Sequence, residues 1–184
     1  HKEMGMTSSL IRDLFTDDVS RLAIDSKREY KQILAYLKGV SPNLRKTVEY
    51  YRDKRPVFDA FGIEQEIEKT SERRAWLKGG GYLVIDHTEA LVAIDVNSGR
   101  NVGKSNQEET VLKTNLEAAK EVARQIRLRD MGGIIVIDFI DMMDPRNRKK
   151  VENEIRQAIR PDRSRIRYSE ISEFGLMEMT RQRV

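Results

Sequence analysis

The sequence predicts an α/β fold in which a mixed sheet is flanked by helices. Two apolar segments, LVAID (residues 91–95) and IIVID (residues 134–138), have the composition of strands. A long run of helical periodicity separates them, which is the pattern of a β-α-β crossover with parallel strands. Further strand-like segments on both sides of this unit are joined by short turns, so antiparallel pairs should complete the sheet.

Residues 1–70 are expected to form a small, mainly helical unit. A helix capped by Ser8 or Ser9 should cover SSLIRDLFTDD, followed by a short strand over RLAID. A second helix should cover KREYKQILAYLK and end near Gly39. Apolar residues at helical spacing in VFDAFGIEQEIEKTSER predict one broken helix after Pro56.

Residues 71–184 contain the remaining predicted elements. Three strands come first, over RRAWLK, YLVIDH and LVAIDVNS. An amphipathic helix should run over residues 106–129 and end at Gly132-Gly133, before the strand IIVID. A helix over PRNRKKVENEIRQAI and strands over RIRYSE and GLMEMTRQ complete the list.

Composition limits the chemistry that this chain can carry. The 184 residues include no cysteine and two histidines, which excludes disulfides and a thiolate zinc site in this chain. Any metal used here should be a hard cation held by carboxylates. No apolar run is long enough for a membrane span and no signal peptide is recognisable, so we expect a soluble, cytoplasmic protein. The first residue is not Met, which suggests a piece of a longer chain.

Asp95 and Asp138 end the two strands of the crossover, at the edge where α/β sheets place their ligands. Two neighbouring carboxylates repel each other unless a cation or a proton lies between them, so the pair predicts a divalent-metal site. Asn97 projects to the same face as Asp95 and can orient its carboxylate. Asp141 could add a third oxygen. Because aspartates after strands are also common turn and helix caps, a structural role stays open at this point.

Two basic features predict contact with a polyanion. The segment GRNVGKS (residues 99–105) resembles a Walker A loop but has three residues between its glycines where the motif has four. We expect Arg100 and Lys104 to contact an RNA backbone rather than a nucleotide, and a solvated loop without a binding role stays open as the alternative. Residues 143–184 hold 11 Lys and Arg against 7 Asp and Glu, which accounts for the net charge of +4. Within RIRY, Arg165 and Arg167 point to one side of a strand and could bind phosphate.

Three segments together resemble the bacterial ribonuclease E/G family of endoribonucleases: GGYLVIDHTEALVAIDVNSGR, TNLEAAKEVARQIRLRDMGGIIVIDFIDM and FGLMEMTRQR. The resemblance implies that residues 71–184 form a DNase I-like catalytic subdomain. It implies that residues 1–70 are a piece of an RNase H-like subdomain, with the tail of a 5′-sensor region at its start. It also implies that Asp95 and Asp138 hold a catalytic Mg²⁺, for which Mn²⁺ can substitute, that Asn97 supports Asp95, and that Arg165 helps to bind the substrate's 5′ phosphate.

The function implied by the resemblance is Mg²⁺-dependent cleavage of single-stranded RNA in rRNA and tRNA processing and mRNA decay, leaving a 5′ phosphate and a 3′ hydroxyl. The family's S1 domain and cysteine zinc link lie outside this chain, so we expect no zinc here, weak or no activity in isolation, and homo-oligomers formed through regions that are absent. The alternatives are a non-catalytic RNA-binding or assembly module and, from GRNVGKS, a nucleotide-binding protein.

Overall fold

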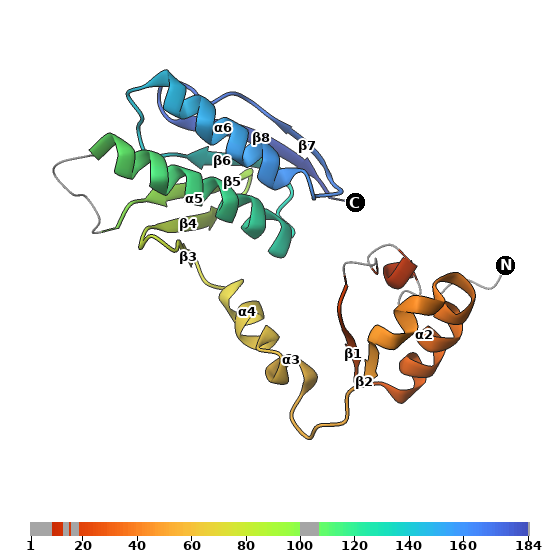
Figure 1. The fold of residues 1–184 in the computed structure, drawn as a ribbon. Helices are drawn as coiled ribbons and strands as arrows, with labels where there is room; N and C mark the ends of the chain where they lie inside the picture. Colours follow the sequence, from red (N-terminus) through yellow and green to blue (C-terminus); the bar gives the residue numbers. More distant parts are fainter. Residues whose placement is uncertain (1–8, 13–14, 16–18, 100–106, 184) are drawn as a thin grey trace. The chain divides into compact units, whose positions relative to one another are not determined.

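The computed structural model describes residues 9–12, 15, 19–99 and 107–183, and the statements below concern those residues. The chain separates into two compact units, residues 1–66 and 67–184 (Figure 1). Each unit has its own cluster of buried apolar side chains. The identification of these units with RNase H-like and DNase I-like subdomains stays a prediction.

The first unit is built on a short parallel pair of strands packed against a helix. Its elements are β1 (Leu22–Ile24), α2 (Lys27–Val40), the 3-10 helix η1 (Pro42–Thr47), β2 (Val48–Tyr50) and α3 (Val57–Ala60). The Ser26 hydroxyl accepts a hydrogen bond from the Glu29 amide over 3.3 Å and so caps α2. The predicted strand and second helix are confirmed, whereas the three-residue β2, parallel to β1, was not expected. Residues 9–12 are helical, and the rest of the predicted first helix lies largely outside the described residues.

The predicted broken helix is confirmed as α3 and α4 (Ile63–Lys69). Gly62 separates them with a φ of +67°, a left-handed conformation that ends α3. The boundary between the two units falls within α4.

The second unit contains a six-stranded mixed sheet with the strand order β3-β4-β5-β6-β8-β7. Its elements are β3 (Arg74–Trp76), β4 (Tyr82–His87), β5 (Leu91–Asn97), α5 (Gln107–Leu128), β6 (Gly133–Asp138), α6 (Pro145–Ile159), β7 (Arg165–Tyr168) and β8 (Leu176–Gln182). The strands β5 and β6 are parallel, and the other four neighbouring pairs are antiparallel. The predicted α/β class, the crossover and the mixed sheet are therefore confirmed.

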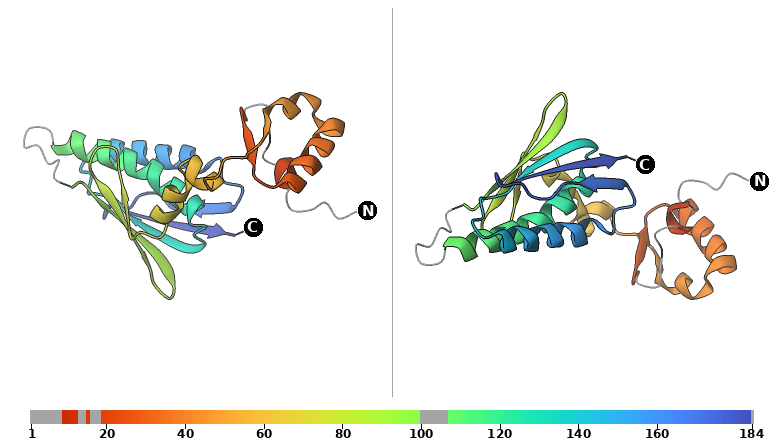
Figure 2. Two further views of the ribbon diagram at one scale, coloured as in Figure 1. Left: turned by 90° about the horizontal axis from the view of Figure 1, so that it is seen from below. Right: turned by 90° about the horizontal axis from the view of Figure 1, so that it is seen from above.

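Helices α5 and α6 both cover the same face of this sheet (Figure 2). The core lies between them and alternate strand residues, which include Leu83, Ile94, Ile135, Ile137 and Met177, each at most 1% exposed. On the opposite face, Trp76 is 63% exposed, Ile134 is 48% exposed and Leu176 is 38% exposed. We call this second side the open face, because no described element of the unit covers it.

The apolar run IIVID is buried on one side only. Ile135 and Ile137 are fully covered, but Ile134 is half exposed on the open face. The apolar run therefore predicted correctly that this strand has a parallel neighbour. One of its apolar side chains, Ile134, nevertheless lies on the open face, which the unit leaves uncovered. Among the described residues, no helix is long and apolar enough to cross a membrane.

Candidate active site

Asp95 and Asp138 are direct neighbours in the sheet. The parallel register of β5 and β6 pairs Asp95 with Asp138, so their Cα atoms are separated by one strand spacing of about 4.8 Å. The residue before each of them, Ile94 and Ile137, is buried against the helices, and alternation then directs both carboxylates to the open face. The structure thus brings together the two residues that the sequence indicated as metal ligands.

Asn97 lies two residues beyond Asp95 on the same face. Its Nδ2 atom donates a hydrogen bond to Asp95 Oδ2 over 2.7 Å. The turn before β4 packs on this end of β5, where a Cβ atom at Gly81 would lie 2.6 Å from the Asn97 carbonyl oxygen. Only a residue without a side chain fits there, which explains part of the glycine run in this turn. The tight packing holds the backbone of Asn97, and Asn97 in turn orients the Asp95 carboxylate.

The electrostatics of the site disfavour a second negative charge. The pKa of Asp138 is raised above its usual value by partial burial, then by the negative charges of Asp95 and Asp141. A carboxylate in this position gains from a bound cation, which would remove the repulsion between neighbours. The pair is therefore an unfavourable arrangement for stability alone and a suitable one for binding a cation.

The donor set fits Mg²⁺. This ion is commonly held by one or two carboxylates, with water and substrate phosphate completing its coordination. Asp95 and Asp138 supply two such ligands on an accessible surface. Within the described residues no group of three or more His, Cys, Asp or Glu side chains is placed to hold a metal, and a third ligand oxygen from Asp141 stays a prediction.

A side chain of α5 holds the segment that follows Asp138. Asn115 is completely buried, and its Nδ2 donates to the Ile140 carbonyl over 2.8 Å while its Oδ1 accepts from the Ile140 amide over 3.1 Å. These two bonds satisfy the backbone where β6 has ended and fix the path toward Asp141. The sequence showed Asn115 only as a polar residue within the apolar face of a helix, which was the available signal for a special role.

Arg165 and Arg167 share the open face with the two aspartates. The register of β7 on β8 pairs them with Gln182 and Thr180, whose side chains alternate with the buried Met179 and Arg181. Arg167 is separated from Asp138 by two strand spacings and four residues along the strands, which is roughly 17 Å between Cα atoms. Arg165 is separated from Asp138 by two strand spacings and six residues, which is roughly 22 Å. At that separation they cannot contact a phosphate bound at Asp138, but they can contact one several nucleotides away.

Three residues of β3 and β4 extend the open face on the other side of Asp95, and the sequence reasoning missed them. The Trp76 and Tyr82 rings lie with their centroids 5.2 Å apart. The Arg74 guanidinium lies 5.1 Å from the centroid of the Tyr82 ring. The sequence pattern that could have identified them is the alternation in RAWLK, which places Arg74 and Trp76 on the same side of the strand.

Arg100 and Lys104 lie outside the described residues, together with most of the GRNVGKS segment. Their predicted contact with RNA stays a prediction.

Comparisons with known proteins agree with the sequence motifs. The family model of the ribonuclease E/G family matches residues 1–184. The chain is 48% identical over its whole length to "Ribonuclease E/G-like protein, chloroplastic" of Arabidopsis thaliana, of which it covers 19%. It is 48% identical to ribonuclease E of Haemophilus influenzae, of which it covers 20%, and 40% identical over 98% of its length to ribonuclease G of Escherichia coli K12, of which it covers 37%. The chain thus spans 19% to 37% of the length of these relatives.

Proposed function

Because this chain belongs to the ribonuclease E/G family, we propose that it carries the catalytic residues of a Mg²⁺-dependent endoribonuclease that cleaves single-stranded RNA. The observation that carries the proposal is the direct pairing of Asp95 with Asp138 on the open face. When bound there, Mg²⁺ would lower the pKa of a coordinated water and neutralise charge on the attacked phosphodiester. Mn²⁺ has the same ligand preferences and is expected to substitute.

The residues of the chain have separate roles in this proposal. Asp95 and Asp138 hold the cation, and Asn97 keeps the Asp95 carboxylate in one orientation through its hydrogen bond. Arg165 and Arg167 bind a phosphate group of the RNA away from the reacting one, consistent with recognition of the 5′ end. The open face leaves room for a single strand to cross the sheet.

The finer parts of the proposal follow the family resemblance. Products carry a 5′ phosphate and a 3′ hydroxyl, so the RNA 2′-OH is not the nucleophile. The substrates are precursors of rRNA and tRNA and messenger RNA in the bacterial cytoplasm, and the complete enzyme is a homo-oligomer. Residues 71–184 act as the DNase I-like catalytic subdomain beside the RNase H-like piece in residues 1–70.

The test compares Asp95→Asn and Asp138→Asn with the wild type in the protein that contains this chain. The substrate is a 5′-monophosphorylated, A/U-rich oligonucleotide, and cleavage is measured as a function of Mg²⁺ concentration. Loss of metal stabilisation worth several kcal/mol should lower kcat/KM by about a hundredfold or more in each variant. Calorimetric titration should show weaker Mg²⁺ binding in both.

Asp86→Asn is the matched control. Asp86 also lies near the end of a strand of this sheet, but its carboxylate is held by Arg73 in two hydrogen bonds of 2.6 and 2.7 Å. This variant should cleave at close to the wild-type rate. Near wild-type rates in the Asp95 and Asp138 variants would refute the catalytic assignment, and unchanged, salt-dependent RNA affinity in the same variants would favour a non-catalytic RNA-binding or assembly module.

A further inference from the structure

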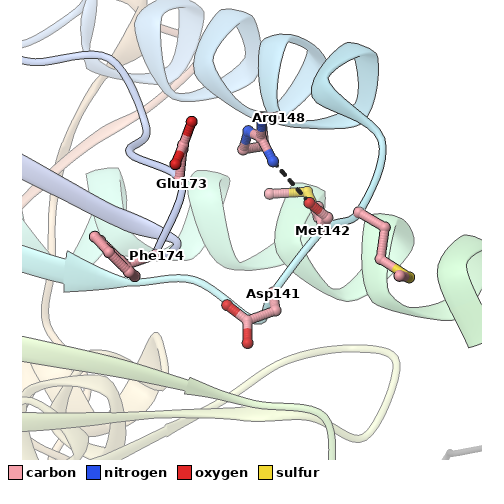
Figure 3. A pocket seen from close by; sticks show the side chains of 6 residues that line it. Asp141, Met142, Arg148, Glu173 and Phe174 are labelled. Atoms are coloured by element: carbon pink, nitrogen blue, oxygen red, sulfur yellow. Dashed lines mark hydrogen bonds between the residues drawn. The ribbon is translucent and has the colours of Figure 1, made fainter.

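A pocket of about 480 Å³ opens next to the carboxyl end of β6 (Figure 3). Asp141, Met142 and Met143 line it from the segment after β6, Arg148 from α6, and Glu173 and Phe174 from the turn before β8. Its volume lies within the range of small-ligand sites. The pocket begins three residues beyond Asp138, and Asp141 is close enough to raise the pKa of Asp138.

Phe174 presents an aromatic ring at this pocket. The residue is 79% exposed, although large apolar side chains are normally covered. Its turn is well fixed, because the Gly175 amide donates to the Ser172 carbonyl over 3.1 Å and the Phe139 amide donates to the Gly175 carbonyl over 3.0 Å. Gly175 has a φ of +79°, and a Cβ atom there would lie 2.6 Å from the Phe139 carbonyl oxygen, so the turn packs directly on the residue after Asp138.

The polar lining of the pocket includes two carboxylates, Asp141 and Glu173, and one guanidinium, Arg148. Among the residues drawn in Figure 3, none donates a hydrogen bond to the carboxylate of Asp141 or of Glu173. Ionised carboxylates only accept hydrogen bonds. Arg148 is the cation of the pocket: its Nη1 donates to the Met142 carbonyl over 2.9 Å, and its other N–H groups can donate to an acceptor of the ligand. A ligand that fits should therefore have a flat apolar face for Phe174 and N–H donors at its edge.

We propose that this pocket binds a nucleobase with an exocyclic amino group, from a nucleotide close to the one whose phosphate lies at Asp138. The base would stack on Phe174 and donate its amino hydrogens to Glu173 or Asp141. Adenine, cytosine and guanine have such a group, whereas uracil has a keto oxygen in its place, which the carboxylates repel, and only its ring N3–H to donate. The proposal rests on the proposed function, since the ligand is part of the RNA substrate.

The test measures RNA binding without cleavage. Fluorescence anisotropy in EDTA compares the oligonucleotides C10 and U10, whose bases have nearly the same size and differ in an amino or a keto group. The wild type should bind C10 about fivefold or more tightly than U10. Phe174→Ala should weaken binding of C10 about fivefold or more, and Phe174→Trp should restore it, because stacking needs a ring rather than a particular side chain.

Glu173→Gln tests the selectivity. The glutamine amide can donate to a keto group, so the ratio of C10 to U10 affinity should fall toward one. Glu170→Gln, which makes the same charge change at a residue paired with Lys149 outside the pocket, should change both affinities alike and keep the wild-type ratio. Phe58→Ala, at another exposed phenylalanine, controls for loss of a ring elsewhere.

Three results would overturn the proposal: equal affinity of the wild type for C10 and U10, no effect of Phe174→Ala beyond that of Phe58→Ala, or the same ratio in Glu173→Gln and Glu170→Gln. These outcomes are separate from the metal proposal, because EDTA removes the metal. Loss of base selectivity with intact dependence on Asp95 and Asp138 would refute the pocket alone. The reverse result would refute the catalytic assignment alone.

Discussion

Asn97 contacts the candidate site through a hydrogen bond from its Nδ2 to Asp95 Oδ2. We predict that Asn97→Ala lowers kcat/KM about 10- to 100-fold, as is typical when a group that orients a metal ligand is removed. Asn97→Asp should be at least as impaired, because it loses the donor and adds a charge beside Asp95. As Asn97 acts through Asp95, raising the Mg²⁺ concentration should restore part of the activity of Asn97→Ala. Activity that is equally low at every Mg²⁺ concentration would contradict a positioning role.

Without a bound metal, the charge of Asp138 should lower the stability of the folded protein. Its raised pKa, caused by partial burial and by Asp95 and Asp141, means that the folded state favours the protonated form. Protonated Asp138 therefore stabilises the folded protein at acidic pH. This stabilisation is lost as the pH rises through the pKa that Asp138 has in the folded state. We therefore predict that, without metal, Asp138→Asn is more stable than the wild type at pH 7, by less than about 1 kcal/mol because the site is exposed to solvent.

Urea unfolding at several pH values tests this prediction. The difference between Asp138→Asn and the wild type should shrink as the pH falls toward 4, near the ordinary pKa of an aspartate, where wild-type Asp138 becomes protonated. Adding Mg²⁺ should stabilise the wild type and leave the variant unchanged. A variant less stable than the wild type at pH 7 would mean that Asp138 has a structural role.

At the level of whole elements, α5 stabilises the site through Asn115. Replacing it with leucine would leave the amide and the carbonyl of Ile140 without the partners they have now. We predict that Asn115→Leu lowers the free energy of unfolding by about 2–4 kcal/mol, since each unpaired buried group costs about 1–3 kcal/mol. The segment from Ile140 to Asp141 should also move, so that kcat/KM falls in the fraction that stays folded.

Asn115→Asp separates hydrogen bonding from packing. At neutral pH the buried carboxylate can accept from the Ile140 amide but cannot donate to its carbonyl. A protonated carboxyl group can do both. Stability of Asn115→Asp relative to the wild type should therefore improve as the pH falls, while that of Asn115→Leu should not. Parallel pH profiles for the two variants would show that the contact with Ile140 is not what makes this position important.

Regular periodicity explains which elements the sequence could predict. The strands β4, β5 and β6 and the helices α5 and α6 are long enough to repeat their patterns, and the crossover rule then pairs β5 with β6 and so Asp95 with Asp138. The strand β2 has three residues, too few to show a period. The contact of Asn115 with Ile140 joins positions 25 apart in sequence, and a helical period cannot say which backbone a buried amide will reach.

For the whole molecule, the net charge of +4 is concentrated in residues 143–184. Part of this surplus is used inside the fold, where Arg181 bonds Asp162 over 2.9 Å and Asp130 over 2.7 Å. Arg165 and Arg167 are instead exposed on the open face. On the proposed function, the position of a charge, more than the total, should therefore decide how RNA is attracted.

Salt dependence of RNA binding can distinguish local from total charge. Each phosphate that an arginine neutralises on a single strand contributes about 0.7 to the slope of log affinity against log salt concentration. We predict that Arg165→Ala and Arg167→Ala each reduce the slope by about 0.7, and that the double variant reduces it by about 1.4. Arg28→Ala is the matched control, because it changes the net charge equally but removes an arginine of α2, in the other unit, whose side chain is 82% exposed. Its slope should equal that of the wild type, and an equal reduction in all three single variants would show that total charge, not the arginines of β7, attracts the RNA.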